Sequence, residues 1–269
     1  MAGTLFLDTF ALGKVARDTT LSQAVRKFIL GNDYTLVIST LNLIEIYPVQ
    51  SLWPPVAEFV ASVPFCIARN SDKILAVEML NYPNKIELPT GFCSRDYAMS
   101  KLELKNAIET NLKGKISDFD SSWRKEKLGI WQALIENKKT FPPEQNGKYS
   151  DFQRWLFLQK NVLMFVVEED KDFASKTIEE GNHIIIECFK SMYILTLAVF
   201  LEYYVQGKLG KASDIGDFFQ LGYAPYVDLA VFDNERNALA QRIRRLSTPL
   251  GTISSYNFRQ FVDIVNGKN

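Results

Sequence analysis

The side chains most able to do chemistry in this sequence are carboxylates at the ends of apolar runs or on helices beside them. Their oxygens are the hard ligands that Mg²⁺ and Mn²⁺ prefer. One or two such ions can generate hydroxide and stabilise the charge that develops on a phosphate, so no histidine base is needed. The candidates for both metal binding and catalysis are Asp8, Glu45, Asp217 and Asp233.

Two of these acids end apolar runs that are typical of buried parallel strands. Asp8 follows Leu5-Phe6-Leu7, and Asp233 follows the run over 227–232. The carboxyl ends of parallel strands lie at one edge of the sheet, where open α/β sheets bind ligands. Asp228 stands near the start of the second run, about 15 Å away at the usual rise per residue, and is expected to be structural.

The other two acids are predicted on helices that reach the same edge. Asp217, with Asp214, falls in the first turn of a helix expected over 214–223. This helix leads into a parallel strand and must run antiparallel to it, so its N-terminus lies at the carboxyl edge. Glu45 lies on the helix that follows a strand expected over 34–38. Direction alone therefore predicts that the four acids meet.

Strands and helices alternate over 1–80 and again over 211–269. This alternation predicts an α/β fold, a three-layer α/β/α sandwich with a parallel central sheet. From 81 to 210 the periodicity is helical with no convincing strand, which predicts an all-helical insertion lobe on the discontinuous sheet domain. Further helices are expected over 11–17, 21–30, 56–61, 71–80, 95–112, 118–136, 150–166, 173–207, 236–246 and 256–265, and further strands over 64–68 and 251–254.

The composition is that of a globular chain without a general affinity for polyanions. Of the 269 residues 47% are hydrophobic, which is enough for a substantial core. Lys plus Arg equals Asp plus Glu at 31 each, so any nucleic-acid site must be local. Cys66, Cys93 and Cys188 form no CxxC pair and favour buried thiols over a zinc site. His183 is predicted mid-helix, where it is poorly placed for catalysis.

No stretch of the sequence predicts a membrane anchor. The N-terminus has no basic region followed by an apolar one, so we expect a cytoplasmic protein. The apolar stretch over 184–204 carries Glu187, Lys190 and Glu202, and such charges are costly in hydrocarbon. A buried helix is the better interpretation of that stretch.

Two basic runs are local candidates for phosphate contacts, although a solvated helix face is the alternative interpretation of each. The first lies in the expected lobe and comprises Lys101, Lys105, Lys113, Lys115, Arg124, Lys125 and Lys127. The second follows the last of the four acids and comprises Arg236, Arg242, Arg244 and Arg245.

The order and spacing of the acids resemble those of PIN-domain proteins. The resemblance rests on Asp8-Thr9 after an apolar strand, on Ser39 six positions before Glu45, and on Asp217 followed after a helix by the run 226–233. It covers roughly the first 80 and the last 60 residues and leaves the helical middle unaccounted for. Two positions depart from the family pattern. Phe10 replaces the usual Asn, which reshapes the rim of the pocket. The family often has Thr or Ser shortly before the last acid, where this chain has Val231-Phe232. The last metal ligand is therefore expected either at Asp233 or one position later, at Asn234.

The resemblance implies a parallel α/β/α sandwich. It also implies a metal-dependent nuclease, with an endoribonuclease as the favoured class and a toxin or defence enzyme as one form of it. It implies that the four acids are both metal ligands and catalytic residues. It favours RNA over DNA as the substrate, and it allows a protein inhibitor or antitoxin-like partner and a homodimer.

Each acid also has a structural interpretation. Asp is favoured at helix caps and turns, and acids in a first helical turn are favourable charges there. Glu45 stands among apolar neighbours, where an unpaired carboxylate is expensive. Two other functions also compete. A phosphatase with Asp8 as nucleophile requires a second Asp where Phe10 stands. A catalytically inactive PIN-like module that binds nucleic acid or protein is the remaining alternative.

Overall fold

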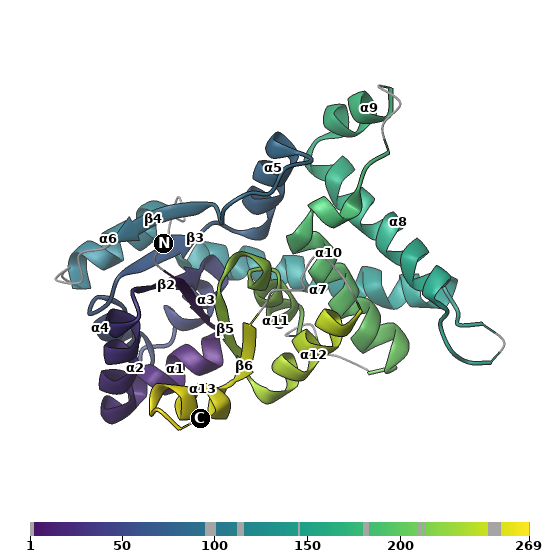
Figure 1. Cartoon of the computed structure of the whole chain (residues 1–269). Coiled ribbons are helices and arrows are strands. Elements are labelled where there is room, and N and C mark those ends of the chain that lie inside the picture. The colour runs from purple at the N-terminus through teal and green to yellow at the C-terminus, as the bar shows by residue number, and fades with distance from the viewer. Residues whose placement is uncertain are drawn as a thin grey trace.

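The computed structural model describes residues 3–94, 101–111, 116–144, 146–179, 183–208, 211, 214–246 and 254–268, and a six-stranded sheet lies at its centre (Figure 1). The strand order is β4-β3-β2-β1-β5-β6. Five strands run parallel, and β4 runs antiparallel beside β3. The strands are β1 (Gly3–Leu7), β2 (Tyr34–Ser39), β3 (Phe65–Ala68), β4 (Thr90–Ser94), β5 (Leu229–Phe232) and β6 (Ser254–Asn257).

The central strands are buried on both faces. In β1, Phe6 packs into one hydrophobic cluster, while Leu5 and Leu7 pack into the cluster on the opposite face. The two clusters likewise divide β5, with Phe232 on the side of Phe6 and Val231 on the other. A strand covered on both faces needs apolar residues at every position, which explains the continuous apolar runs in the sequence.

Helices cover both faces, so the protein is α/β with its parallel sheet between helical layers, as predicted (Figure 1). The helices that contribute to the cluster around Phe6 include α5 (Ser71–Asn81), α8 (Asp151–Glu169), α9 (Lys171–Glu179), α10 (Lys190–Val199), α11 (Asp214–Leu221) and α12 (Asn234–Arg245). Those that contribute to the opposite cluster include α1 (Thr9–Arg17), α2 (Thr19–Gly31), α4 (Trp53–Val60), α6 (Lys101–Asn111) and α13 (Phe258–Val265).

Two helices stand at the carboxyl edge of the sheet. The helix α3 (Thr40–Ile46) directly follows β2 and contributes to both clusters. The long helix α7 (Ile116–Thr140) packs against α3 and α11. A helix from the predicted insertion therefore lies beside the elements that carry Glu45 and Asp217.

The prediction that 81–210 contains no strand is wrong, because β4 pairs with β3. An edge strand has one neighbour to bond, and the short run Thr-Gly-Phe-Cys-Ser has neither alternation nor β-branched enrichment to reveal it. The division into a sheet domain and an insertion lobe stays a prediction. The cluster around Phe6 continues without a break into α8 and α10.

The single helix predicted over 173–207 is also wrong. The chain forms α9, the turn η1 (Ile186–Cys188), α10 and then the π-helical stretch η2 (Phe200–Val205). His183 lies between α9 and η1 and not within a helix. Residues 191–199 are buried all round, so their apolar character gave no periodicity from which the helix start could be located.

The other predicted elements are present with shifted ends. The helix predicted over 95–112 is found as α6, and the remainder of that range lies outside the described residues. The strand predicted over 251–254 is found as β6, with 251–253 again outside them. Before β5, residues Ala224–Tyr226 form the short turn η3.

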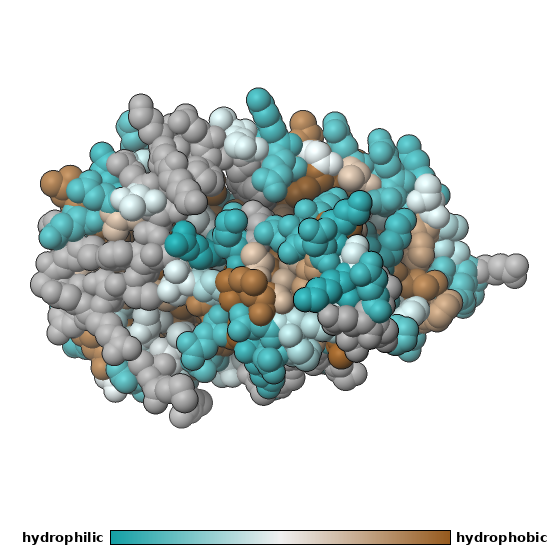
Figure 2. Space-filling view, turned by 90° about the horizontal axis from the view of Figure 1, so that it is seen from above, coloured by the Kyte–Doolittle hydropathy of each residue, from teal (hydrophilic) through white to brown (hydrophobic). Residues whose placement is uncertain are grey.

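In the part of the chain that the structure describes, helices long and apolar enough to cross a bilayer are lacking. On the face seen in Figure 2, hydrophobic side chains form separate small patches between hydrophilic ones. The one stretch that raised a membrane interpretation, 184–204, is folded into η1, α10 and η2 against the sheet layer.

Candidate active site

Asp8 connects the end of β1 to the start of α1. Its Oδ1 accepts a hydrogen bond from the backbone N–H of Ala11 at 2.6 Å, which caps the helix, and its Oδ2 accepts one from the N–H of Asp233 at 2.8 Å. The side chain is only 5% exposed. Burial raises the pKa of Asp8 to about 7, the two backbone bonds oppose this rise, and the charges of Asp233 and Asp217 add to it.

Asp233 has the matching place on the neighbouring strand. The strands β1 and β5 pair in parallel with Leu7 beside Val231, so both chains leave the sheet at the same edge. Asp233 then caps α12 by accepting the N–H of Arg236 on Oδ1 at 2.7 Å. The structural interpretation of these two acids is therefore correct as far as it goes. Each one caps a helix, and each also faces the other across the strand ends.

Glu45 is held by polar neighbours at the same edge. Its Oε2 accepts hydrogen bonds from the Thr9 hydroxyl at 2.5 Å and from the Gln220 amide at 3.0 Å. Its Oε1 lies 2.9 Å from the place that a Cβ would take at Gly216, so the absence of a side chain there lets α11 approach the carboxylate. The pKa of Glu45 is raised by burial first and then by Asp217, against the lowering by Thr9, Lys127 and Gln220.

Asp217 is paired with an arginine. The Arg236 guanidinium donates to Asp217 Oδ2 at 2.7 Å and lies 3.9 Å from Asp214 Oδ1. It is 8% exposed and lies over the Phe218 ring at 5.1 Å from the centroid. Burial raises the pKa of Asp217, Arg236 lowers it, and the charges of Asp233 and Asp214 raise it further. Arg236, predicted either to contact phosphate or to lie on a solvated helix face, instead points inward to the acids.

The structure places the four acids at the same edge of the sheet, near enough for their charges to interact. The charge of Asp8 interacts with those of Asp233 and Asp217, and Asp217 interacts with Glu45. Each carboxylate is oriented by its own hydrogen bonds, to backbone N–H groups or to polar side chains. In the part of the chain that is described, no three Asp, Glu, His or Cys side chains already stand in an arrangement that could hold a metal ion.

Sequence reasoning missed the neutral partners that connect these acids. Gln220, buried on α11, donates to the Thr9 hydroxyl at 2.9 Å as well as to Glu45, and accepts from the Thr9 N–H at 3.3 Å. Asn42 donates to the same hydroxyl at 3.2 Å, and its carbonyl accepts from Ser39 N–H and Oγ–H, each at 2.9 Å. One signal was available, because Gln220 follows Asp217 by three positions and so shares its helix face.

The structure also shows where some of the other residues singled out in the sequence lie. Asp228 lies at the opposite edge, where its Oδ2 accepts from Thr4 N–H at 2.7 Å and Thr4 Oγ–H at 2.9 Å, so its structural role is confirmed. Lys127, from the first basic run, lies near Glu45 and lowers the pKa of that carboxylate. The side chains of Lys101, Lys113 and Lys115 lie outside the described residues.

Comparisons of the chain with protein-family models, with curated proteins and with solved structures found no match.

Proposed function

We propose that this protein is a Mg²⁺- or Mn²⁺-dependent nuclease with a PIN-like site at the carboxyl edge of its sheet. The observation that carries the proposal is the meeting of four carboxylates from four separate elements at the edge where α/β sheets bind ligands. Burial and mutual repulsion raise the pKa of three of them, so a divalent cation would stabilise the cluster.

The residues present fit such an ion. The donor set consists of carboxylate oxygens, which suit Mg²⁺ and Mn²⁺. The Asp8 carboxylate accepts two backbone hydrogen bonds. Because an ionised carboxylate offers about four lone-pair positions, Asp8 can still bind an ion. Asp217 is held by Arg236 through Oδ2. The ion would be held by Asp8, Glu45, Asp217 and Asp233.

The chain itself supplies position and charge. A bound ion would supply a hydroxide at neutral pH and stabilise the charge on the attacked phosphate. Thr9 and Gln220 hold the Glu45 carboxylate, and Asp8 and Asp233 are held as the caps of α1 and α12. Because these orientations do not yet form a metal-binding group among the described residues, the carboxylates would turn toward the ion when it binds. Lys127 adds positive charge beside Glu45, where it favours the approach of a phosphate.

RNA as substrate, and an antitoxin-like protein partner, are supported by the resemblance to PIN-domain ribonucleases alone. A second candidate function is favoured by one contact. The Arg236 guanidinium already neutralises Asp217, as it would in a catalytically inactive PIN-like module that binds nucleic acid or protein without metal. The two candidates differ in whether the acids are needed for turnover.

The test compares Asp8→Asn with Asp228→Asn on mixed RNA in Mn²⁺ or in EDTA. The first variant keeps the shape of the side chain and one oxygen to accept the Ala11 N–H, but it gives up the bond from the Asp233 N–H and loses the charge that holds the cation. Cleavage should therefore fall by about a thousandfold or more. The second makes the same change at the wrong edge and should cleave nearly as wild type does. Thermal unfolding of both variants checks the fold. Cleavage that resists EDTA, or that survives Asp8→Asn, would overturn the metal-dependent mechanism at these acids, and a wild-type protein that binds RNA without cleaving it would favour the inactive module.

A further inference from the structure

The helix α8 is apolar on two faces, and only one of them packs into the core. Its inner face contributes Phe157, Leu158, Val162 and Val166 to the cluster around Phe6. Its outer face lies along the outside of the molecule (Figure 1) and carries five large apolar side chains that are between 38% and 65% exposed. These side chains are Phe152, Trp155, Leu156, Met164 and Val167. A helix that is apolar all round is expected to be covered all round.

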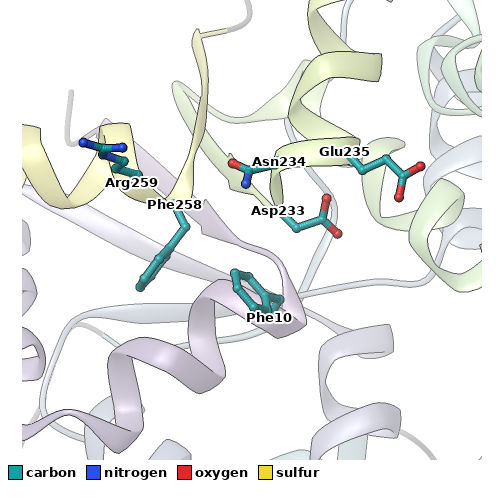
Figure 3. A pocket seen from close by; sticks show the side chains of 6 residues that line it. All are labelled: Phe10, Asp233, Asn234, Glu235, Phe258 and Arg259. Atoms are coloured by element: carbon teal, nitrogen blue, oxygen red, sulfur yellow. The ribbon is translucent and has the colours of Figure 1, made fainter.

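The aromatic rings on this outer face differ from the exposed ring near the acids. Phe10 lines the pocket in Figure 3, where Phe258 meets it edge to face with centroids 5.8 Å apart. Lys14 Nζ also lies 5.7 Å from the centroid of the Phe10 ring. On α8, Phe152 stacks on Trp155 of the same helix, with centroids 5.9 Å apart. The two rings therefore form one continuous apolar surface on the outside of the helix.

The apolar residues of this face have the same spacing when they are counted from either end of the helix. The centre of the pattern lies between Gln159 and Lys160. A contact between two copies about a two-fold axis has this property, because residue i of one copy meets residue j of the other and j meets i. With the half-buried Leu163 included, the matching pairs are Phe152 with Val167, Trp155 with Met164, and Leu156 with Leu163.

The charges near the two ends of α8 favour one of the two possible directions. Residues 148–154 carry two cations and one acid, and the acid, Asp151, pairs with Arg154 at 2.8 Å. Residues 168–172 carry four acids and one lysine. Two parallel copies of the helix would place the two acidic ends together, where they repel. An antiparallel pair places each acidic end beside the basic start of the other copy, which is favourable.

We propose that this face is the contact between two copies of the chain, packed antiparallel about a two-fold axis at the middle of α8. Phe152 then packs on the partner's Val167. Leu156 packs on the partner's Leu163. The two Gln159 side chains meet near the axis, where each amide can donate to and accept from the other and so fix the register. The helix lies in the part of the chain that the PIN resemblance leaves unaccounted for, and the acids take no part in the contact, so this dimer is independent of the proposed nuclease function.

The first test is sedimentation equilibrium of the full chain. A contact made by one helix from each copy lies at the small end of specific interfaces, below roughly 1,200 Å², so we expect a dimer that forms at micromolar concentrations. Leu156→Lys places an unpaired charge in the contact and should raise the dissociation constant by about tenfold or more. Leu102→Lys is the matched control, because Leu102 is exposed on α6, which packs on the opposite face of the sheet.

Thermal unfolding of both variants checks that each one is folded. A wild-type protein that stays monomeric up to about 100 µM, far above the micromolar range, would overturn the proposal. It would also be overturned by a folded Leu156→Lys variant that dimerises as well as Leu102→Lys does.

Disulfide crosslinking then tests the direction of the two helices. Phe152→Cys and Val167→Cys should crosslink when the two variants are mixed and oxidised, because these positions face each other across the contact. Neither variant should crosslink by itself beyond the background of oxidised wild type, since the two copies of one position lie about 22 Å apart, fifteen residues at the usual rise. Crosslinking within one variant alone would indicate parallel helices and overturn the arrangement. A mixture that gives no crosslink would overturn the contact itself.

Discussion

Two places in this protein bury a carboxylate and raise its pKa to about 7, and they have different consequences. One is Asp8 at the carboxyl edge of the sheet. The other is Glu78 on α5, which is 2% exposed and lies against α10 and η3. In both cases burial is the largest cause of the rise.

The neighbours of the two carboxylates are opposite in kind. Glu78 Oε1 accepts from the Tyr226 hydroxyl and from the Ser191 N–H, and the charge of Lys190 stabilises the carboxylate. Asp8 is instead surrounded by further acids that repel it. Burial alone therefore does not identify a functional carboxylate. A gathering of like charges is the stronger indication of a functional site, because the mutual repulsion raises the pKa of its members and a bound cation would relieve it.

The sharpest way to break this comparison is to neutralise one carboxylate of each region. Glu45→Gln should lower Mn²⁺-dependent RNA cleavage by about a thousandfold, since the amide keeps the bonds of Thr9 and Gln220 in reach but loses a metal ligand. Glu78→Gln, the same change in the helix contact, should leave cleavage unchanged. Single-turnover cleavage of the two variants decides. Equal losses in both would mean that the effect is structural.

A smaller effect is expected at Glu78, on the pH dependence of the stability of the protein. The folded-state pKa of Glu78, about 7, lies above its usual 4.5, so its protonated form is the one that stabilises the fold. That contribution is fully present below pH 4.5 and is lost as pH rises through about 7. Glu78→Gln should therefore gain stability relative to wild type between pH 5 and pH 8, on the order of 2 kcal/mol.

Urea unfolding of both proteins across that pH range measures the difference. Asp8 also has a raised pKa and changes the stability in the same direction with pH. Because wild type and Glu78→Gln both contain Asp8, its contribution drops out of the difference between them. A stability difference that stays constant from pH 5 to pH 8 would show that Glu78 does not carry a proton in the folded protein.

The sequence predicted the parts of this site that follow from strand direction. Asp8 and Asp233 were placed at the carboxyl edge because each follows an apolar run of the parallel sheet, and Asp228 at the opposite edge because it stands near the start of such a run. Helix direction was enough to bring Glu45 and Asp217 to them.

Features that depend on helix rotation and long-range packing were not predictable in the same way. Arg236 is one of several arginines on α12, and only the rotation of that helix against α11 turns it toward Asp217. Asn42 and Gln220 are neutral and carry no charge pattern that draws attention to them. The edge strand β4 depends on β3 for its bonds, and the breaks between α9 and α10 fall in a stretch without periodicity.

The most direct test of the central claim is Mn²⁺ binding measured by isothermal titration calorimetry, without substrate. Asp8→Asn is compared with Asp18→Asn, because Asp18 caps α2 through Oδ1 as Asp8 caps α1 but stands away from the acids. Asn is as good a cap as Asp, so neither change should unfold a helix. We predict that wild type and Asp18→Asn bind one or two Mn²⁺ ions and that Asp8→Asn loses this binding. Absence of binding in wild type, or unaltered binding in Asp8→Asn, would contradict the account.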